Sequence, residues 1–180
     1  MRPRCHNNVN RPSLAFNNLA LAELKRAQPL LARAWVRQAL RVKPGDKAAL
    51  FNQAQVDRAL AARRVPAGFT GTWRSYAGAG EWNTLEVQDQ GDGRLRFMVF
   101  ALRMGANWRE YGPAAVGNVD GEVTLQAGKA RFKGEDCALA LAFSGDEASV
   151  EQEGDCGFGV GVDASGTYLR TDDARPRLEQ

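Results

Sequence analysis

Apolar residues in the first third of the chain recur at three- and four-residue intervals, the spacing of one face of an α-helix. The pattern predicts three helices, over residues 14–26, 30–42 and 47–63. Ser13 and Asp46 are residue types that cap helix N-termini, and Pro29 suits a first helical turn. Pro44 and Gly45 end the second helix. We therefore expect this part of the chain to be α-helical.

From residue 65 onwards, short apolar runs return about every ten residues, separated by Gly, Asp, Asn and Ser. The candidate strands cover residues 69–75, 84–88, 95–102, 108–111, 121–125, 130–133, 137–143, 148–153, 158–162 and 167–170. Turn signals such as Asp120-Gly121 and Ser144-Gly145-Asp146 favour hairpins between them. Because closure removes exposed strand edges, the pattern predicts an antiparallel barrel or sandwich of eight or nine strands, and the chain belongs to the α+β class.

Charge and glycine content change at the same place. Residues 1–64 carry 13 Lys and Arg against 3 Asp and Glu, whereas residues 65–180 carry 11 against 18. Gly45 is the only one of the 19 glycines before residue 65. We therefore divide the chain into a disordered tail (1–12), a helical domain (13–64), a β domain (65–172) and a second tail (173–180). Opposite charges also raise the alternative that the domains dock, within the chain or as a homodimer.

A 34-residue period links the first and third predicted helices. Residues 16–20 precede residues 50–54 by 34 positions, which aligns Asn18 with Asn52 and Ala20 with Ala54. The period and its residues resemble the tetratricopeptide repeat, a 34-residue helix–turn–helix unit. Further positions that match this family are Phe16, Leu19, Ala32, Trp35, Val36, Ala39 and Pro44. The resemblance covers residues 13–64, about one and a half repeats, whereas three or more normally bury their faces against one another.

The resemblance implies a binding surface for a protein or peptide partner, since the first helix of each repeat in that family lines a concave surface. The residues expected on it are Asn17, Leu21, Lys25, Asn52 and Gln55. Their amide and ammonium groups suit a peptide backbone or a carboxylate. The alternative is that Asn18 and Asn52 only satisfy backbone groups between helices. The β domain, a second copy or further repeats would cover the rest of the helical fragment.

Two of the three cysteines continue apolar faces of predicted strands. Cys137 alternates in phase with Leu139, and Cys156 alternates in phase with Phe158 and Val160. A Cys137–Cys156 disulfide between neighbouring strands is the expectation, and two buried thiols are the alternative. Cys5 is then left over in a polar tail.

Two further resemblances concern the β domain. Gly71-Thr72-Trp73 and Arg170 resemble lipocalin-like barrels, in which the arginine packs over the tryptophan at the closed end. Residues 133–137, 153–159 and 166–168 are similar to C-terminal domains of bacterial envelope proteins, some of which accompany helical domains similar to lysozyme inhibitors. This second resemblance implies a periplasmic or secreted protein. Because the first eight residues have no apolar signal region, a cytoplasmic protein is the alternative.

The sequence offers little chemistry. His6 is its one histidine, so we expect no catalytic triad, no metal site and no cofactor. Residues 157–161 form a Gly-rich run that lacks the lysine of a phosphate loop, and we interpret them as a strand. The basic residues are spread around helices, which does not favour nucleic-acid binding. No apolar stretch reaches the roughly 20 residues of a membrane span.

Three functions follow from these observations. The leading one is a non-enzymatic protein–protein interaction module in which the helices bind a partner and the barrel forms a cap. The first alternative is a bacterial envelope inhibitor or immunity-type protein that blocks a secreted or cell-wall enzyme through acidic turns. The second is a lipocalin-like carrier, which needs an internal cavity. A barrel filled by Trp73, Phe97, Val99, Leu139 and Leu141 would speak against a carrier.

Overall fold

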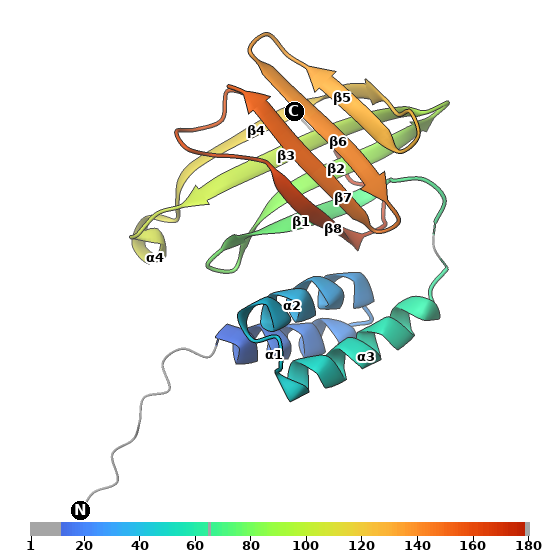
Figure 1. Cartoon of the computed structure of the whole chain (residues 1–180), viewed down its shortest axis with the longest axis vertical. Helices are drawn as coiled ribbons and strands as arrows, with labels where there is room; N and C mark the ends of the chain where they lie inside the picture. The colour runs from blue at the N-terminus through green and yellow to red at the C-terminus, as the bar shows by residue number, and fades with distance from the viewer. Residues whose placement is uncertain (1–11, 65, 179–180) are drawn as a thin grey trace, which may run out of the picture. The chain divides into compact units, whose positions relative to one another are not determined.

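The computed structural model describes residues 12–64 and 66–178, and the chain divides into two compact units at residues 64 and 65. The helical unit has three helices, and the β unit has an eight-stranded antiparallel sheet (Figure 1). The α+β class is confirmed. Most of both predicted tails, residues 1–11 and 179–180, lies outside the described residues. Residues 173–178 contain neither helix nor strand.

The three predicted helices are present, and their ends differ from the prediction by at most two residues. They are α1 (Pro12–Lys25), α2 (Pro29–Val42) and α3 (Lys47–Ala61). Asp46 caps α3, since its Oδ1 accepts hydrogen bonds from the backbone N–H groups of Ala48 and Ala49 at 3.0 and 3.3 Å. Ser13 does not cap α1 as expected, because it lies inside that helix and its hydroxyl donates to Asp46 at 3.0 Å.

Small residues let the helices approach one another closely. Ala20, Ala32 and Ala39 are completely buried, at the positions where the repeat-like pattern places small residues. The rings of Phe16 and Trp35 stack beside them with centroids 5.7 Å apart. Several residues of the 34-residue pattern therefore lie in the core of the helical unit, whereas Leu19, which also matches the pattern, is 40% exposed.

The sheet of the β unit runs in the order β4-β3-β2-β1-β8-β7-β6-β5. Its strands are β1 (Gly71–Gly78), β2 (Glu81–Gly91), β3 (Arg94–Met104), β4 (Pro113–Thr124), β5 (Lys129–Lys133), β6 (Cys137–Ser144), β7 (Glu147–Gly154) and β8 (Gly166–Asp172). The paired neighbours in the described sheet are antiparallel, and β1 pairs with β8 although they are the first and last strands. The order is that of an up-and-down meander with a seam between β4 and β5.

Side chains close much of this seam. A methyl group at Gly121 of β4 would come within 2.6 Å of the Phe132 ring of β5, so only a glycine leaves room for that ring. Phe132 also packs edge-on against Phe97, with centroids 5.4 Å apart. Further along β4, Gly117 leaves room for Phe158 in the same way. The sheet is therefore nearly closed, in place of the closed barrel that the sequence favoured.

Two candidate strands are not strands. Residues 108–111 form the short helix α4 (Trp108–Tyr111), which ends at Gly112. Residues 158–162 form turns between β7 and β8, because Gly157 and Gly161 have φ angles of +72° and +69° that interrupt an extended backbone. Val160 in this segment is 87% exposed, which overturns its expected place beside Cys156 on an inward face.

Candidate functional site

Two of the predicted partner-binding residues face each other in the helical interior. Nδ2 of Asn52 on α3 donates a 2.9 Å hydrogen bond to Oδ1 of Asn17 on α1, and these residues are 7% and 6% exposed. The expectation that both amides face a partner is therefore corrected. The alternative role between helices is closer, but the contact joins two side chains and not a side chain and the backbone, and it uses Asn17, whereas Asn18 is exposed.

The other three predicted residues remain accessible. Leu21 and Lys25 are exposed on α1, and Gln55 is half-buried on α3. Their role in binding stays a prediction.

The helical unit exposes large apolar side chains that the prediction did not include. Phe51 of α3 is 64% exposed and Leu50 is 45% exposed, while Ala49, Asn52 and Val56 of the same helix are buried. The 34-residue period could have indicated that Leu50 is exposed, because Leu50 occupies the position of Phe16 in the second, incomplete repeat. Phe16 packs on α2, and the described residues between α3 and β1 (62–64 and 66–70) contain no second helix of that kind.

Asp46 joins the start of α3 to the start of α1. Its carboxylate accepts the hydroxyl of Ser13 and the cap hydrogen bonds, and Lys43 Nζ lies 3.8 Å from Oδ2. The hydrogen bond from Ser13, followed by that from the Ala49 backbone, lowers the pKa of Asp46 below its usual range. The network fixes the end of α3 that precedes Leu50 and Phe51.

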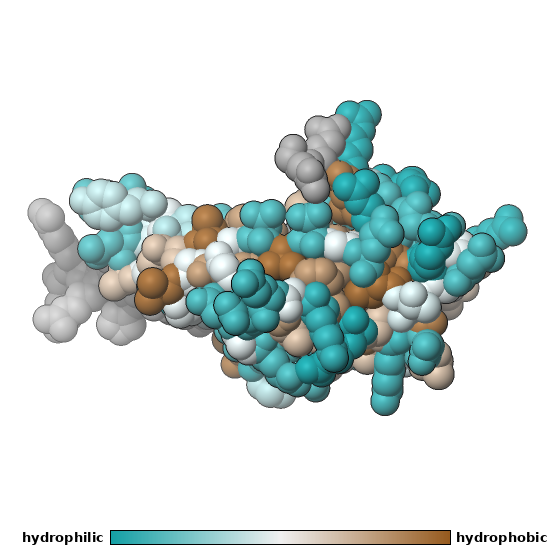
Figure 2. All heavy atoms as spheres, turned by 90° about the horizontal axis from the view of Figure 1, so that it is seen from above, coloured by the Kyte–Doolittle hydropathy of each residue, from teal (hydrophilic) through white to brown (hydrophobic). Residues whose placement is uncertain are grey.

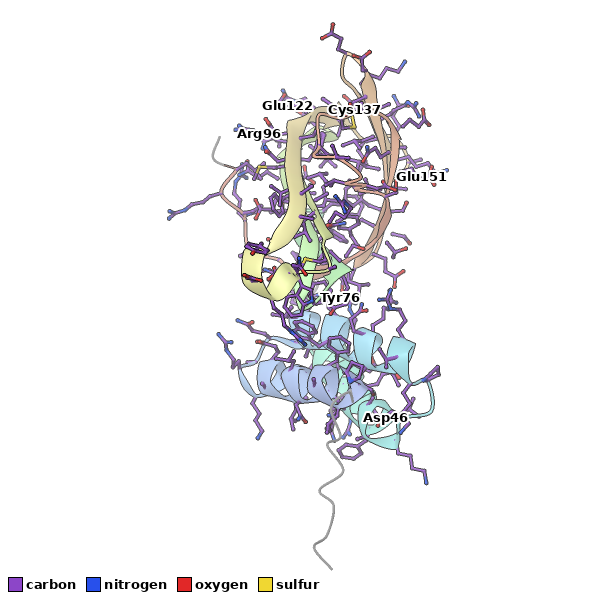
Figure 3. The ribbon with its side chains drawn as sticks, turned by 90° about the vertical axis from the view of Figure 1, so that its left-hand side faces the viewer. Asp46, Tyr76, Arg96, Glu122, Cys137 and Glu151 are labelled. Atoms are coloured by element: carbon purple, nitrogen blue, oxygen red, sulfur yellow. A yellow bond between two sulfur atoms is a disulfide. The ribbon has the colours of Figure 1, made fainter. Side chains whose placement is uncertain are left out.

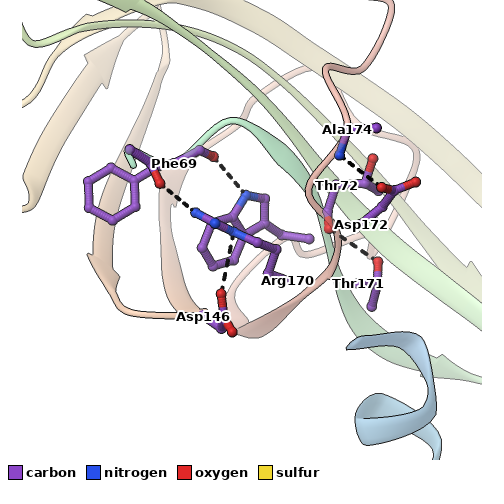
Figure 4. Close-up of polar contacts among 9 residues, drawn as sticks. Phe69, Thr72, Asp146, Arg170, Thr171, Asp172 and Ala174 are labelled. Carbon is purple, nitrogen blue, oxygen red and sulfur yellow. Dashed lines mark hydrogen bonds and ion pairs between the residues drawn. The ribbon is translucent and has the colours of Figure 1, made fainter. Parts of the chain in front are cut away.

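At one end of the sheet, Arg170 of β8 covers Trp73 of β1 (Figure 4). Its Cζ lies 4.5 Å from the ring centroid, and both residues are at most 1% exposed. The Arg170 guanidinium donates to the carbonyl oxygen of Gly68 at 2.8 Å, and its Nε lies 3.7 Å from Oδ1 of Asp146. The contact expected from the lipocalin-like residues is present. The aromatic ring, the carbonyl and the carboxylate together hold this buried cation, so we assign the contact a structural role in joining β8 to β1.

Side chains fill the interior of the β unit. Trp73, Phe97, Val99, Leu139 and Leu141 are all at most 2% exposed and belong to one core cluster. The buried Tyr168 hydroxyl donates to the carbonyl oxygen of Ala164 at 2.7 Å, and burial raises the pKa of this tyrosine. This packing speaks against a carrier that holds its ligand among these residues.

A shallow hollow of about 310 Å³ lies on the outer side of the sheet. Its lining consists of Thr84, Glu86, Met98, Phe100 and Asn118. Burial raises the pKa of Glu86, and the positive charge of Arg74 opposes that shift. Figure 2 shows, on the face of the molecule seen there, exposed hydrophobic residues bordered by hydrophilic ones.

The disulfide gathers carboxylates at one corner. Cys137, at the start of β6, is bonded to Cys156 in the connection between β7 and β8, with Cα atoms 4.6 Å apart. The predicted bond is present, although it does not join two neighbouring strands. Beside it, the backbone N–H of Asp155 donates to the carbonyl oxygen of Asp136 at 2.9 Å. Glu135, Asp136 and Asp155 are all exposed, and Figure 3 locates Cys137.

Among residues 12–64 and 66–178, no group of three or more His, Cys, Asp and Glu side chains is arranged to hold a metal ion. His6 and Cys5 lie outside the described residues. Within the same ranges, no helix has the length and apolar character needed to cross a membrane. Comparison of the chain with protein-family models, curated proteins and solved structures found no match.

Proposed function

We propose that the chain is a non-enzymatic protein-interaction module whose helical unit binds a carboxylate-bearing peptide segment of a partner protein. The exposure of Phe51 and Leu50 on α3 carries this proposal. Exposed aromatic and large aliphatic side chains are typical anchors of protein interfaces. The repeat-like pattern, with its small buried residues, supports the same class of function.

Charge supports the choice of a carboxylate-bearing partner. Residues 12–64 contain ten Lys and Arg but only Glu23, Asp46 and Asp57 as acids. Lys25 is exposed on α1, and Lys47 is exposed near Leu50 on α3. Basic side chains around an apolar anchor favour the approach of an acidic segment and fix its orientation.

The disulfide supports a periplasmic or secreted location. Disulfides persist in oxidising compartments and are rare in the bacterial cytosol. We propose this location on the Cys137–Cys156 bond alone, since the absence of a spanning helix does not bear on it.

A selection from a displayed peptide library tests the binding proposal. The bait is the full chain, and the Phe51→Asp variant serves for counter-selection. The proposal expects enriched peptides that contain apolar residues flanked by Asp or Glu. It is wrong if peptides enriched on the wild-type chain bind the variant equally well, or if no peptide is enriched.

The disulfide corner favours the inhibitor alternative as a second candidate. The bond and the hydrogen bond from the Asp155 backbone N–H to the Asp136 carbonyl bring exposed Asp155 close to exposed Glu135 and Asp136, which are neighbours in the sequence. Such a surface suits a cationic enzyme, and the binding would weaken with salt. Replacement of Glu135, Asp136 and Asp155 by their amides should abolish that inhibition and leave the peptide binding of the helical unit unchanged.

A further inference from the structure

Three neighbouring strands present three different kinds of side chain on their outer side. The outward residues of β5 are Lys129, Arg131 and Lys133; those of β6 are Ala138, Ala140, Ala142 and Ser144; and those of β7 are Glu147, Ser149, Glu151 and Glu153. The residues that alternate with them, such as Leu139 and Val150, are buried in the core. We call this surface the charged-row face: a row of cations and a row of carboxylates on either side of a row of small residues.

The strand register aligns the three rows. Arg131 lies opposite Ala140, which in turn lies opposite Glu151, and Lys133, Ala138 and Glu153 are aligned in the same way. Because neighbouring strands are about 4.8 Å apart, the two charged rows are about 10 Å apart. Figure 3 shows Glu151 on the outer side of the sheet.

The small residues leave a trough between the charged rows. A hollow of about 340 Å³ occupies one end of it, with Lys129, Ala142 and Ser149 among its lining residues. At the other end, Nη1 of Arg131 reaches across the alanine row to Oε1 of Glu153 at 3.3 Å. The side chains of that ion pair are still 44% and 62% exposed, so both remain accessible to further charges.

This arrangement is complementary to itself. When two such faces meet about a two-fold axis parallel to β6, the cation row of each copy lies opposite the carboxylate row of the other. The alanine rows then face each other, and the small side chains allow close approach at the Ala142 end, away from the Arg131–Glu153 ion pair. A two-fold axis in the plane of the face but perpendicular to the strands would instead place like charges opposite each other. We propose that the charged-row face is an interface between two copies of this chain, related by a two-fold axis parallel to β6.

The size of the face sets the strength of the association. It spans three strands, of which β5 has five residues, so it is smaller than the roughly 800 Å² per partner of a standard stable interface. The dimer is therefore weak and dissociates on dilution. Since exposed charges hold it together, added salt weakens it. The homodimer expected from oppositely charged domains stays a prediction; here both signs of charge belong to the β unit.

Charge reversal tests the interface and its symmetry in the full chain. One variant combines Lys129→Glu, Arg131→Glu and Lys133→Glu, and a second combines Glu147→Lys, Glu151→Lys and Glu153→Lys. Sedimentation velocity over a concentration series at low salt measures association. The wild-type chain should dimerise, each variant alone should associate at least tenfold more weakly, and an equimolar mixture of the two variants should form a heterodimer. The chain with all six reversals should dimerise again.

Two controls make the test specific. Arg96 lies on the outer side of β3, opposite Glu122 of β4 and outside the charged-row face (Figure 3). The Arg96→Glu variant should therefore leave dimerisation unchanged. Phe51→Asp should also leave it unchanged, which separates this proposal from peptide binding by the helical unit. Circular dichroism melts check that each variant folds. The proposal is wrong if the wild-type chain stays monomeric at every concentration, or if the mixture does not associate.

Discussion

The guanidinium of Arg170 lies over the ring of Trp73, with Cζ 4.5 Å from the centroid, and only 1% of Arg170 is exposed. Cations are rarely buried so completely unless charge and hydrogen-bond partners surround them. Here the Gly68 carbonyl and the Asp146 carboxylate complete the surroundings. The contact joins β8 to β1, the last and first strands, and fixes this end of the sheet.

Removal of Arg170 should destabilise the β unit. Arg170→Ala leaves the Asp146 carboxylate and the Gly68 carbonyl without this buried donor, and we expect a loss of about 3–5 kcal/mol in the free energy of unfolding. Urea unfolding followed by tryptophan fluorescence measures it. Arg175→Ala is the control, because Arg175 makes an exposed hydrogen bond to Gln88. Similar losses of unfolding free energy for both variants would show that the buried Arg170 contact contributes no more stability than an exposed hydrogen bond.

The Asn17–Asn52 pair should stabilise the helical unit. Asn17→Ala leaves the buried Nδ2 of Asn52 without its acceptor, and a loss of about 1–3 kcal/mol is expected. Asn18→Ala changes an exposed neighbour on the same helix and should stay within about 0.5 kcal/mol. Thermal unfolding followed by far-ultraviolet circular dichroism compares the two. Equal effects would mean that the buried hydrogen bond does not hold α1 and α3 together.

The helical unit should lose stability in acid through Asp46. The pKa of its carboxyl is lower in the folded chain than its ordinary value of 3.8, because Ser13 and the backbone of Ala49 donate to the charged form. A carboxyl whose pKa is lower in the folded than in the unfolded chain stabilises the fold at every pH above its unfolded-state pKa. This stabilisation is lost as the pH falls through the folded-state pKa. The melting temperature of the helical unit should therefore decrease when the pH is lowered below about 4.

Asp46→Asn is the matched variant for that titration. It removes the titrating group, so its melting temperature should start lower at neutral pH and change less in acid than that of the wild-type chain. Ser13→Ala should give an intermediate result, since it removes the largest cause of the pKa shift. Identical acid dependence in all three proteins would exclude Asp46 as the origin.

The disulfide should leave one titratable thiol in the oxidised, unfolded chain, that of Cys5. Its loop spans a sequence separation of 19 residues, and such a loop contributes about 3 kcal/mol, in the chain-entropy account, through the unfolded state. Cys137→Ser with Cys156→Ser should lower the free energy of unfolding by about that amount. Three reactive thiols in the oxidised chain would contradict the bond and remove the support for an oxidising compartment.

The sequence predicted the helices well because their signals are local. The three- and four-residue period, Pro29 and the Asp46 cap all lie within or next to the helices that they define. The prediction of a strand at Trp108–Tyr111 is wrong, because four residues with an aromatic at each end fit a strand and a helical turn equally well. The prediction of a strand at 158–162 is wrong because positive φ angles at Gly157 and Gly161 interrupt the extended backbone.

The candidate sites depended more on contacts distant in sequence. The period aligned Asn18 with Asn52, but only the packing of α1 on α3 shows that Asn17 is the residue in contact. The charged rows were not recognised because each strand alone shows an ordinary polar side, and their alternation across β5, β6 and β7 requires the strand register. In the sequence, only the resemblance to lipocalin-like barrels links Arg170 with Trp73, because the two residues are far apart along the chain.

The affinity of a selected peptide for two matched variants tests most directly the claim that the helical unit is a binding module. Phe51→Asp changes the proposed anchor on α3, whereas Val42→Asp changes an apolar residue on α2 that is also about half exposed, at 48%. Fluorescence anisotropy of the labelled peptide with the full chain gives both dissociation constants. We predict that Phe51→Asp weakens binding by about tenfold or more and that Val42→Asp has little effect. Equal affinities for the two variants would contradict this prediction.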